Sequence, residues 1–169
     1  IFRMLKKIGC YRISYGLESG NEEFRRNVLS RKISNEKLLH HFDIIADCGI
    51  PFSVNLIIGM PHETRDMVFD TIQLVKNIRN YDSLTVSIFV PYRGTVLRKV
   101  AIAEGWLDTN KTSTHTTHTS MLDMPFFTAK EIDGMMQTLP LYVEFDKSHW
   151  PEIEKIEKEV LRLPSHERA

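Results

Sequence analysis

Cysteine is scarce in this sequence of 169 residues, and its placement excludes several kinds of site. Cys10 and Cys48 are the only two, and no C-x2-C spacing is present. Two isolated cysteines cannot by themselves build an iron–sulfur cluster site. Such cysteine usage is typical of a reducing compartment, so we expect two buried thiols rather than a disulfide, and a cytoplasmic location.

Long apolar runs and an excess of one charge are also lacking. No run reaches the roughly 18 residues that a membrane helix needs, and no signal-peptide pattern opens the chain. Basic and acidic residues balance at 22 each, so the charge gives no indication of a nucleic-acid surface or an acidic tail. The sequence begins with Ile1 instead of Met, and we expect a fragment or a processed form.

Three stretches alternate apolar with small or polar residues at every second position, which predicts strands with two different faces. They lie at residues 11–18, 51–59 and 83–91. Apolar residues at helical spacing predict helices between and after them, at residues 2–8, 22–29, 35–48, 64–80, 95–105, 129–145 and 150–161. Strands alternating with helices indicate an α/β fold with a parallel sheet.

The face pattern favours a barrel wall over an open sheet, which remains the alternative. In the first strand Tyr11 and Leu17 belong to an apolar face that helices would cover, whereas the other face is small and polar and ends in Glu18. Strands of an open, doubly covered sheet are usually apolar throughout. Ligands of parallel α/β proteins sit beyond the carboxyl ends of the strands, so Glu18 is placed where chemistry is expected.

The polar segment 108–123 contains the pair His115 and His118. No carboxylate or cysteine shares a metal-ligand spacing with the pair, so we expect a solvated loop and no metal site. Pro140 should break or kink the helix predicted over residues 129–145. The last residues, 164–169, should fray.

The strand ends carry an ordered set of motifs: Gly16-Leu-Glu-Ser-Gly20, Leu29-Ser-Arg-Lys-Ile-Ser34, Gly59-Met-Pro-His-Glu-Thr64 and Pro91-Tyr-Arg-Gly-Thr95. In this order and with these gaps, they resemble the C-terminal half of the core of radical S-adenosylmethionine (radical SAM) enzymes. The resemblance covers residues 1–108 and implies the last three βα units of a partial TIM-type barrel. Residues 109–169 would then form a loop and a helical C-terminal extension.

The resemblance implies contacts to S-adenosylmethionine. Glu18 matches an acidic residue beside the ligand's ribose, and Arg31 matches a basic residue that reaches the methionine carboxylate. The remaining implied cofactor-binding residues flank the same ligand at the strand ends: Ser19, Asn55, Ile57, Gly59, Val90 and Tyr92. Each position also has a structural interpretation: helix-terminal charge for Glu18, surface charge for Arg31, and barrel packing for Ile57 and Gly59. Glu63 and Thr64 are expected to cap the following helix.

Lys32 and His62 stand where the family commonly has glycine, and Arg93 stands where proline is common. The family's C-x3-C-x2-C loop, which holds a [4Fe–4S] cluster, is absent from this chain. The resemblance therefore implies a parent enzyme that cleaves S-adenosylmethionine to a 5′-deoxyadenosyl radical for hydrogen abstraction or methyl transfer, with the isolated chain inactive and its catalytic residues unknown. The alternative is a non-catalytic half-barrel module that binds a partner.

The segments Met121–Thr128, Leu139–Phe145 and Trp150–Ile153 resemble the tail of radical SAM proteins that carry an N-terminal cobalamin-binding domain. The substrate is not indicated.

An edge strand without an inward lysine or a central proline, together with an apolar lumen face, predicts a dimer of the fragment. The alternative is closure by the helix at 129–145, which would bury Ile132, Met135, Met136 and Leu139.

Overall fold

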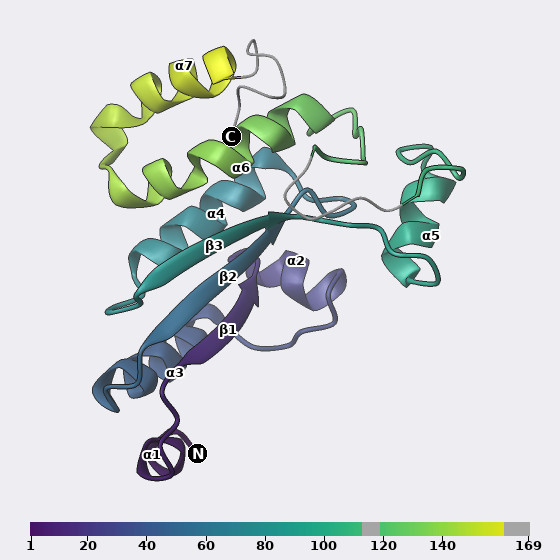
Figure 1. The fold of residues 1–169 in the computed structure, drawn as a ribbon. Helices are drawn as coiled ribbons and strands as arrows, with labels where there is room; N and C mark the ends of the chain where they lie inside the picture. Colours follow the sequence, from purple (N-terminus) through teal and green to yellow (C-terminus); the bar gives the residue numbers. More distant parts are fainter. Residues whose placement is uncertain (113–118, 161–169) are drawn as a thin grey trace. The chain divides into compact units, whose positions relative to one another are not determined.

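A computed structural model describes residues 1–112 and 119–160 (Figure 1). The histidine pair 115 and 118 and the predicted fraying of 164–169 lie outside these residues. The described elements are α1 (Phe2–Lys7), β1 (Ile13–Glu18), α2 (Glu22–Asn27), α3 (Asn35–Asp47), β2 (Phe52–Ile58), α4 (Arg65–Lys76), β3 (Ser83–Ile88), α5 (Val96–Ala103), α6 (Ala129–Glu144), the 3-10 turn η1 (Lys147–His149) and α7 (Trp150–Val160).

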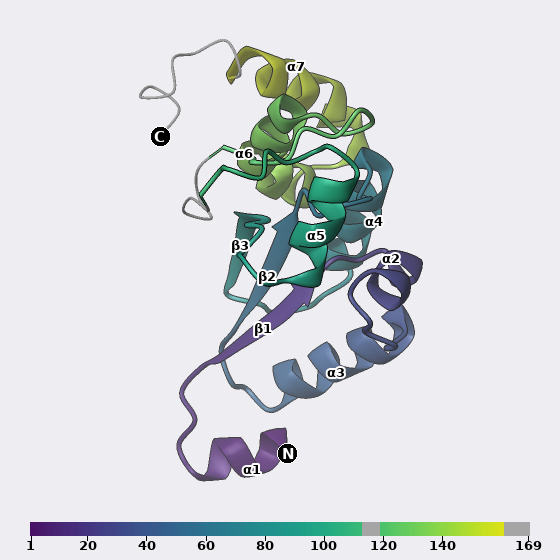
Figure 2. The same cartoon turned by 90° about the vertical axis from the view of Figure 1, so that its right-hand side faces the viewer.

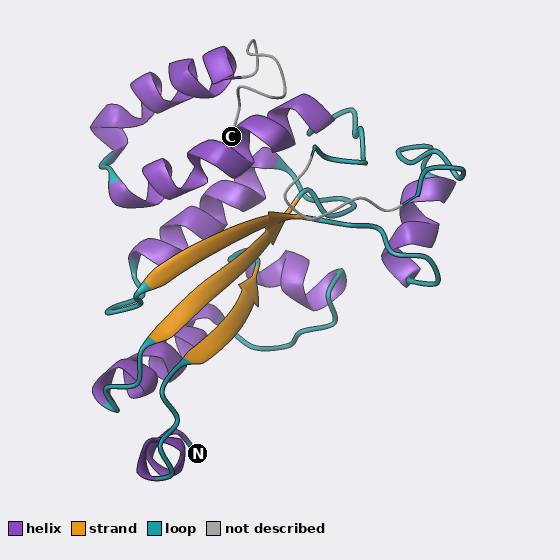
Figure 3. Cartoon of the chain, in the orientation of Figure 1, coloured by secondary structure: helices purple, strands orange, loops and turns teal. Residues whose placement is uncertain are grey.

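The three strands form one sheet in the order β1-β2-β3 (Figure 3). β1 pairs with β2 in parallel, with Ile13 opposite Phe52. The link from β2 to β3 runs in the same direction, because Asp82 N donates to Phe52 O (3.0 Å) and Phe89 N donates to Ile58 O (2.8 Å). The predicted α/β fold, with three parallel strands of a partial barrel and a helical C-terminal part, is confirmed.

The chain divides into two compact units, which are described separately. The first consists of residues 1–56 and 66–86, and the second of residues 57–65 and 87–169. The predicted strand-end residues are therefore distributed over both units. Glu18, Ser19, Arg31 and Asn55 belong to the first, whereas the second contains Ile57, Gly59, Val90 and Tyr92.

In the first unit, α3 packs on the apolar face of β1 and β2. The ring centroid of Phe42 lies 4.6 Å from that of Tyr15 and 5.7 Å from that of Phe52. Phe42 and Phe52 are almost completely buried, and burying such a side chain contributes roughly 1.5–3 kcal/mol. The predicted helix-covered face is confirmed from Ile13 onward, but Tyr11 was wrongly assigned to it, because β1 begins two residues later and Tyr11 is 83% exposed.

Hydroxyl side chains begin two of the helices. Ser34 Oγ accepts from Lys37 N (3.3 Å) at α3, and Thr95 Oγ1 accepts from Arg98 N (3.4 Å) at α5. Each satisfies one of the main-chain donors that a helix leaves without an internal partner. Most helices end earlier than predicted; α4, for example, ends at Lys76 instead of about residue 80.

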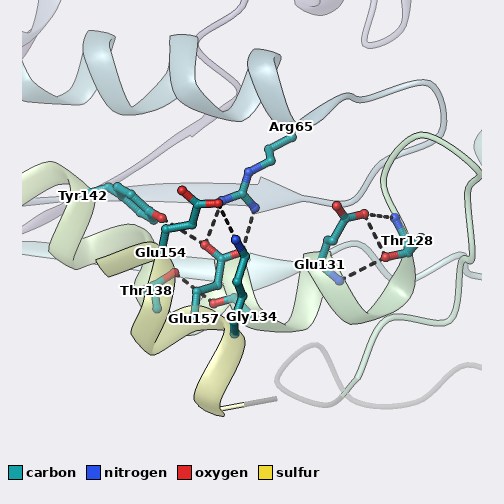
Figure 4. A network of polar contacts seen from close by, with 9 residues as sticks. Arg65, Thr128, Glu131, Gly134, Thr138, Tyr142, Glu154 and Glu157 are labelled. Atoms are coloured by element: carbon teal, nitrogen blue, oxygen red, sulfur yellow. Dashed lines mark hydrogen bonds and ion pairs between the residues drawn. The ribbon is translucent and has the colours of Figure 1, made fainter. Parts of the chain in front are cut away.

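In the second unit, α6 and α7 lie side by side in both views (Figures 1 and 2). Thr128 and Glu131 form a capping box that begins α6 (Figure 4). The helix is not broken at Pro140, contrary to one of the two predicted outcomes, and this residue is exposed. Of the four apolar residues predicted to be buried by this helix, Ile132, Met135 and Leu139 are fully buried and Met136 is half-buried.

No helix among the described residues has the length and apolar character needed to cross a bilayer. Cys10 and Cys48 are free thiols, but both are half-buried rather than buried. Cys48 lies at the C-terminal cap of α3, and the Cys10 thiol donates to Arg12 O (3.4 Å).

Candidate functional site

Glu18 ends β1 in a left-handed conformation, with φ 66°. The pairing of β1 with β2 shifts register between Gly16 and Glu18, which marks a bulge of the kind that redirects side chains near active sites. The redirected carboxylate folds back over Gly16: a β-carbon on that residue would lie 2.5 Å from Glu18 Oε1. The position of this carboxylate therefore depends on glycine at residue 16.

Arg31 joins Glu18 at the same place. Its Nη1 donates to Gly16 O (2.9 Å), and its Nη2 lies 3.3 Å from Glu18 Oε1. The Arg31 side chain is 46% exposed and that of Glu18 19%. Because solvent screens the pair, it contributes little to stability, about 0–1 kcal/mol. Two predicted site residues thus meet at the carboxyl end of β1, with charged atoms open to solvent.

A buried arginine holds the segment that carries Arg31. Arg25 is 1% exposed and donates to Ser19 O (2.8 Å), Ile33 O (3.0 Å) and Asn35 Oδ1 (2.6 Å). Arg31 N in turn donates to Arg25 O (2.9 Å). Burial lowers the pKa of the Arg25 guanidinium. Sequence reasoning missed this residue, because the main-chain carbonyls that hold it leave no sequence signal.

Asn55 lies beside this pair on the polar face of the sheet. Asn55 on β2 lies opposite Gly16 on β1. Its amide Nδ2 donates to Ser14 Oγ (2.7 Å). Ser53 also donates to Ser14 Oγ (3.3 Å), so small polar side chains line this face as predicted. Ser19 differs, since it is fully buried and its hydroxyl lies 3.4 Å from Thr71 Oγ1 on α4. That hydroxyl already has a partner within the protein.

In the second unit, Gly59 opens the turn after β2 with φ 77°. A β-carbon there would lie 2.8 Å from Cγ2 of Ile132 on α6, so the space that the glycine leaves is occupied by this side chain. The resemblance had implied a ligand contact at Gly59, with packing as the alternative. The packing of the C-terminal extension is a sufficient reason for glycine at this position.

The Glu63 side chain accepts hydrogen bonds from main-chain amides of the same turn. It is fully buried, and its Oε2 accepts from Gly59 N (2.7 Å) and Met60 N (3.3 Å). Among the described residues Oε1 has no hydrogen-bond partner. Burial raises the pKa of this carboxyl to about 8, against the opposing effect of the two main-chain bonds. The residue therefore stabilises the turn before α4 through its Oε2. The sequence had predicted that Glu63 caps the following helix instead.

The segment after β3 is held by a second buried arginine. Arg98 is 5% exposed and donates to Pro91 O (2.8 Å), Thr109 O (3.2 Å) and Lys111 O (3.0 Å). It joins the end of β3 to the chain beyond α5. Next to this anchor Val90 is buried and Tyr92 is 56% exposed, so the phenol of Tyr92 is available for a contact outside the protein.

The structure is that of a parallel α/β protein with a charged pair at the carboxyl end of one strand. Comparison with known proteins makes this more specific. The sequence profile of the radical SAM superfamily matches residues 1–75, in agreement with the resemblance seen in the motifs. The match spans β1 to α4 and includes both Glu18 and Arg31.

A curated protein is similar to most of this chain. The chain is 26% identical, over 145 residues, to an uncharacterized methyltransferase of Pyrococcus horikoshii. The alignment covers 86% of this chain but only 31% of the relative, so the chain spans about a third of the relative's length.

Proposed function

We propose that this chain is part of the substrate- and cofactor-binding half of a radical SAM enzyme. The observation that carries the proposal is the meeting of Glu18 and Arg31 over Gly16 at the carboxyl end of β1, within the segment that matches the family. One carboxylate and one guanidinium, both partly exposed, are the groups that a zwitterionic nucleoside ligand requires.

The two side chains fit S-adenosylmethionine in distinct ways. The Glu18 carboxylate would accept hydrogen bonds from the ribose hydroxyls, and donors of the Arg31 guanidinium would hold the methionine carboxylate. When bound to a [4Fe–4S] cluster and reduced, S-adenosylmethionine supplies a carbon radical for hydrogen abstraction or methyl transfer. The cluster ligands would come from the parent protein, because this chain has only Cys10 and Cys48.

The remaining contacts are proposed for the adenine side of the ligand. Ile57, Gly59, Val90 and Tyr92 follow the ends of β2 and β3, with Tyr92 offering an exposed ring. Because Ile132 fills the space beside Gly59, the base would be approached through main-chain atoms of this turn instead of through a gap at the glycine. Asn55 would contribute polar contact, and Ser19 would position the strand end through its buried hydroxyl.

Further features belong to the same proposal. Residues 1–108 would be the barrel segment and residues 109–169 the extension, in a cytoplasmic parent. Methyl transfer is supported by the name of the Pyrococcus relative, which calls it a methyltransferase. Cobalamin as a second cofactor is proposed from the resemblance of the C-terminal segments alone. The isolated chain would be inactive and would carry no cluster after anaerobic reconstitution; stoichiometric iron and sulfide would contradict this.

The decisive experiment uses the parent protein. Its reading frame should encode a C-x3-C-x2-C motif about one hundred residues before Ile1, and the reconstituted protein should cleave S-adenosylmethionine under reducing conditions. A parent that lacks the motif and leaves S-adenosylmethionine intact would support the non-catalytic module. In the same experiments, light scattering on the isolated chain tests the proposed dimer, and a sharp monomer peak would refute it.

A further inference from the structure

His62, Trp106 and Phe126 form an aromatic cluster on the loops of the second unit. The ring centroid of Trp106 lies 5.0 Å from that of His62 at an interplanar angle of 77° and 5.4 Å from that of Phe126 at 89°. Both contacts are edge-to-face, the arrangement that aromatic rings prefer. His62 is exposed, and Phe126 is 43% exposed. The three residues come from the turn after β2, the segment after α5 and the loop before α6.

The backbone of His62 is unusual for its residue type. Its φ is 67°, a left-handed conformation that glycine adopts without strain and that other residues seldom occupy. The resemblance to radical SAM enzymes implies glycine at this position, where this chain has histidine. Residues held in such conformations cluster at ligand contacts, where surrounding structure maintains them.

Here the surrounding structure does maintain it. On one side Pro61 is buried, and on the other Glu63 is fully buried and bonded to the Gly59 and Met60 amides. With both neighbours anchored inward, the imidazole at position 62 is directed outward against Trp106.

The other two rings are presented in the same manner. Leu107 anchors Trp106 from the following position, with 4% exposure. Asp123 N donates to Trp106 O (3.1 Å), which ties the end of α5 to the loop before α6. In that loop Met124 pairs with Phe127, both fully buried, so Phe126 between them faces solvent.

We propose that His62, Trp106 and Phe126 are a subsite for a planar aromatic or heteroaromatic group of the substrate. The inference rests on the proposed function, since it places this group beside the turn at the carboxyl end of β2, where parallel α/β enzymes bind ligands. The faces and edges of aromatic rings recognise another flat ring by stacking. A saturated ring of equal size has no such face.

The test follows Trp106 in the full-length parent labelled with nitrogen-15 at its tryptophans. The indole signal of Trp106 is assigned with Trp106→Phe, and Trp150 serves as the internal reference, because it packs on Tyr142 in another part of the unit. Quinoline is the planar probe and cyclohexanol the saturated control. The Trp106 signal should shift saturably with quinoline alone, while the Trp150 signal stays in place.

The variants separate binding from folding. His62→Ala and Phe126→Ala should each weaken quinoline binding at least about five-fold, whereas His40→Ala, which changes an exposed histidine on α3, should not. His62→Gly should also lose binding while its unfolding midpoint stays equal or rises, since glycine relieves the left-handed φ. A lowered midpoint for His62→Gly would mean that the imidazole only packs.

Two further outcomes would overturn the subsite. One is an unshifted Trp106 signal at saturating quinoline. The other is displacement of quinoline by S-adenosylmethionine, which would assign the rings to the adenine of the cofactor. Calorimetric binding of S-adenosylmethionine to the same protein tests the proposed function separately, so failure of one inference leaves the other open to its own measurement.

Discussion

Arg31 holds the main-chain carbonyl of Gly16 and the carboxylate of Glu18 with the same guanidinium, at 2.9 and 3.3 Å. Two residues selected separately from sequence motifs are thus one structural unit at the end of β1. Because Arg31 is about half exposed, part of its donor capacity can serve a ligand while the rest keeps Glu18 in place. The arrangement explains why a carboxylate and an arginine thirteen residues apart would act together.

Arg31→Ala in the full-length parent should weaken S-adenosylmethionine binding by about ten- to a hundred-fold, because a hydrogen bond to a charged group contributes roughly 1.5–3 kcal/mol. Arg79→Ala is the matched control: Arg79 is also exposed and bonds a carboxylate, that of Asp43, at 2.8 Å. Isothermal titration calorimetry on both variants measures the difference. Equal affinities would mean that Arg31 is only a surface charge.

Two glycines of the first unit should respond differently to alanine. In Gly16→Ala the new methyl meets the end of the flexible Glu18 side chain at 2.5 Å, so the carboxylate moves, folding is nearly unchanged and S-adenosylmethionine affinity falls. In Gly20→Ala the methyl meets main-chain atoms of α4, with Thr71 Cα at 2.4 Å. Overpacking of this kind costs about 1–3 kcal/mol or more of stability.

Urea denaturation and calorimetry distinguish these two effects. A Gly16→Ala protein that binds S-adenosylmethionine normally would show that the place of the Glu18 carboxylate does not matter for the ligand. A Gly20→Ala protein of unchanged stability would contradict the close approach of β1's end to α4.

The buried carboxyl of Glu63 should make the free energy of unfolding depend on pH. Burial raises its pKa to about 8 in the folded protein, above the value of about 4.5 expected for an unfolded chain. Between these values the folded state binds more protons than the unfolded state, so stability falls as pH rises from about 4.5 to about 8. Glu63→Gln keeps an oxygen for the Gly59 and Met60 amides without this titration. Denaturation at pH 5, 6.5 and 8 should show the slope in the original protein and a flatter one in the variant.

Asp66→Asn is the control for this measurement, because Asp66 is an exposed carboxylate at the start of α4. Its pH profile should follow that of the original protein. If Glu63→Gln retains the full slope, another group is responsible for it.

The sheet could be predicted from the sequence because its signal is local. Alternation at every second position is visible residue by residue, and Ser34 and Thr95 mark helix starts through bonds to residues three positions on. The motif order added the placement of Glu18 and Arg31 at a strand end. These features depend on neighbours in sequence, which a single chain displays directly.

What the sequence did not reveal depends on distant contacts. Arg25 and Arg98 are buried because main-chain carbonyls of loops surround them, and carbonyls have no sequence signature. The reason for Gly59 lies in Ile132, far along the chain. Glu63 was predicted to cap a helix, but its carboxylate turns back to the preceding amides, a choice that the packing of the whole turn decides.

A buried ion pair between Arg65 and Glu157 holds the C-terminal extension (Figure 4). Arg65, at the start of α4, donates two hydrogen bonds to Glu157 on α7, at 2.6 and 2.8 Å, and the Tyr142 hydroxyl donates a third at 3.1 Å. Glu157 is 4% exposed, whereas the Arg65 side chain is 26% exposed. Burial and the neighbouring carboxylate raise the pKa of Tyr142, so its hydroxyl remains a donor.

Arg65→Ala should destabilise the protein by about 3 kcal/mol, because it leaves a carboxylate buried without its cation. Tyr142→Phe should cost less, about 1 kcal/mol, since Arg65 still pairs with Glu157. The control is Lys158→Ala, which removes an exposed ion pair with Glu154 on the same helix and should change stability little. Urea denaturation of the three variants gives the order. If Arg65→Ala and Lys158→Ala were equally mild, α7 would be held by its apolar residues alone, and the bidentate pair would be an accessory to that packing.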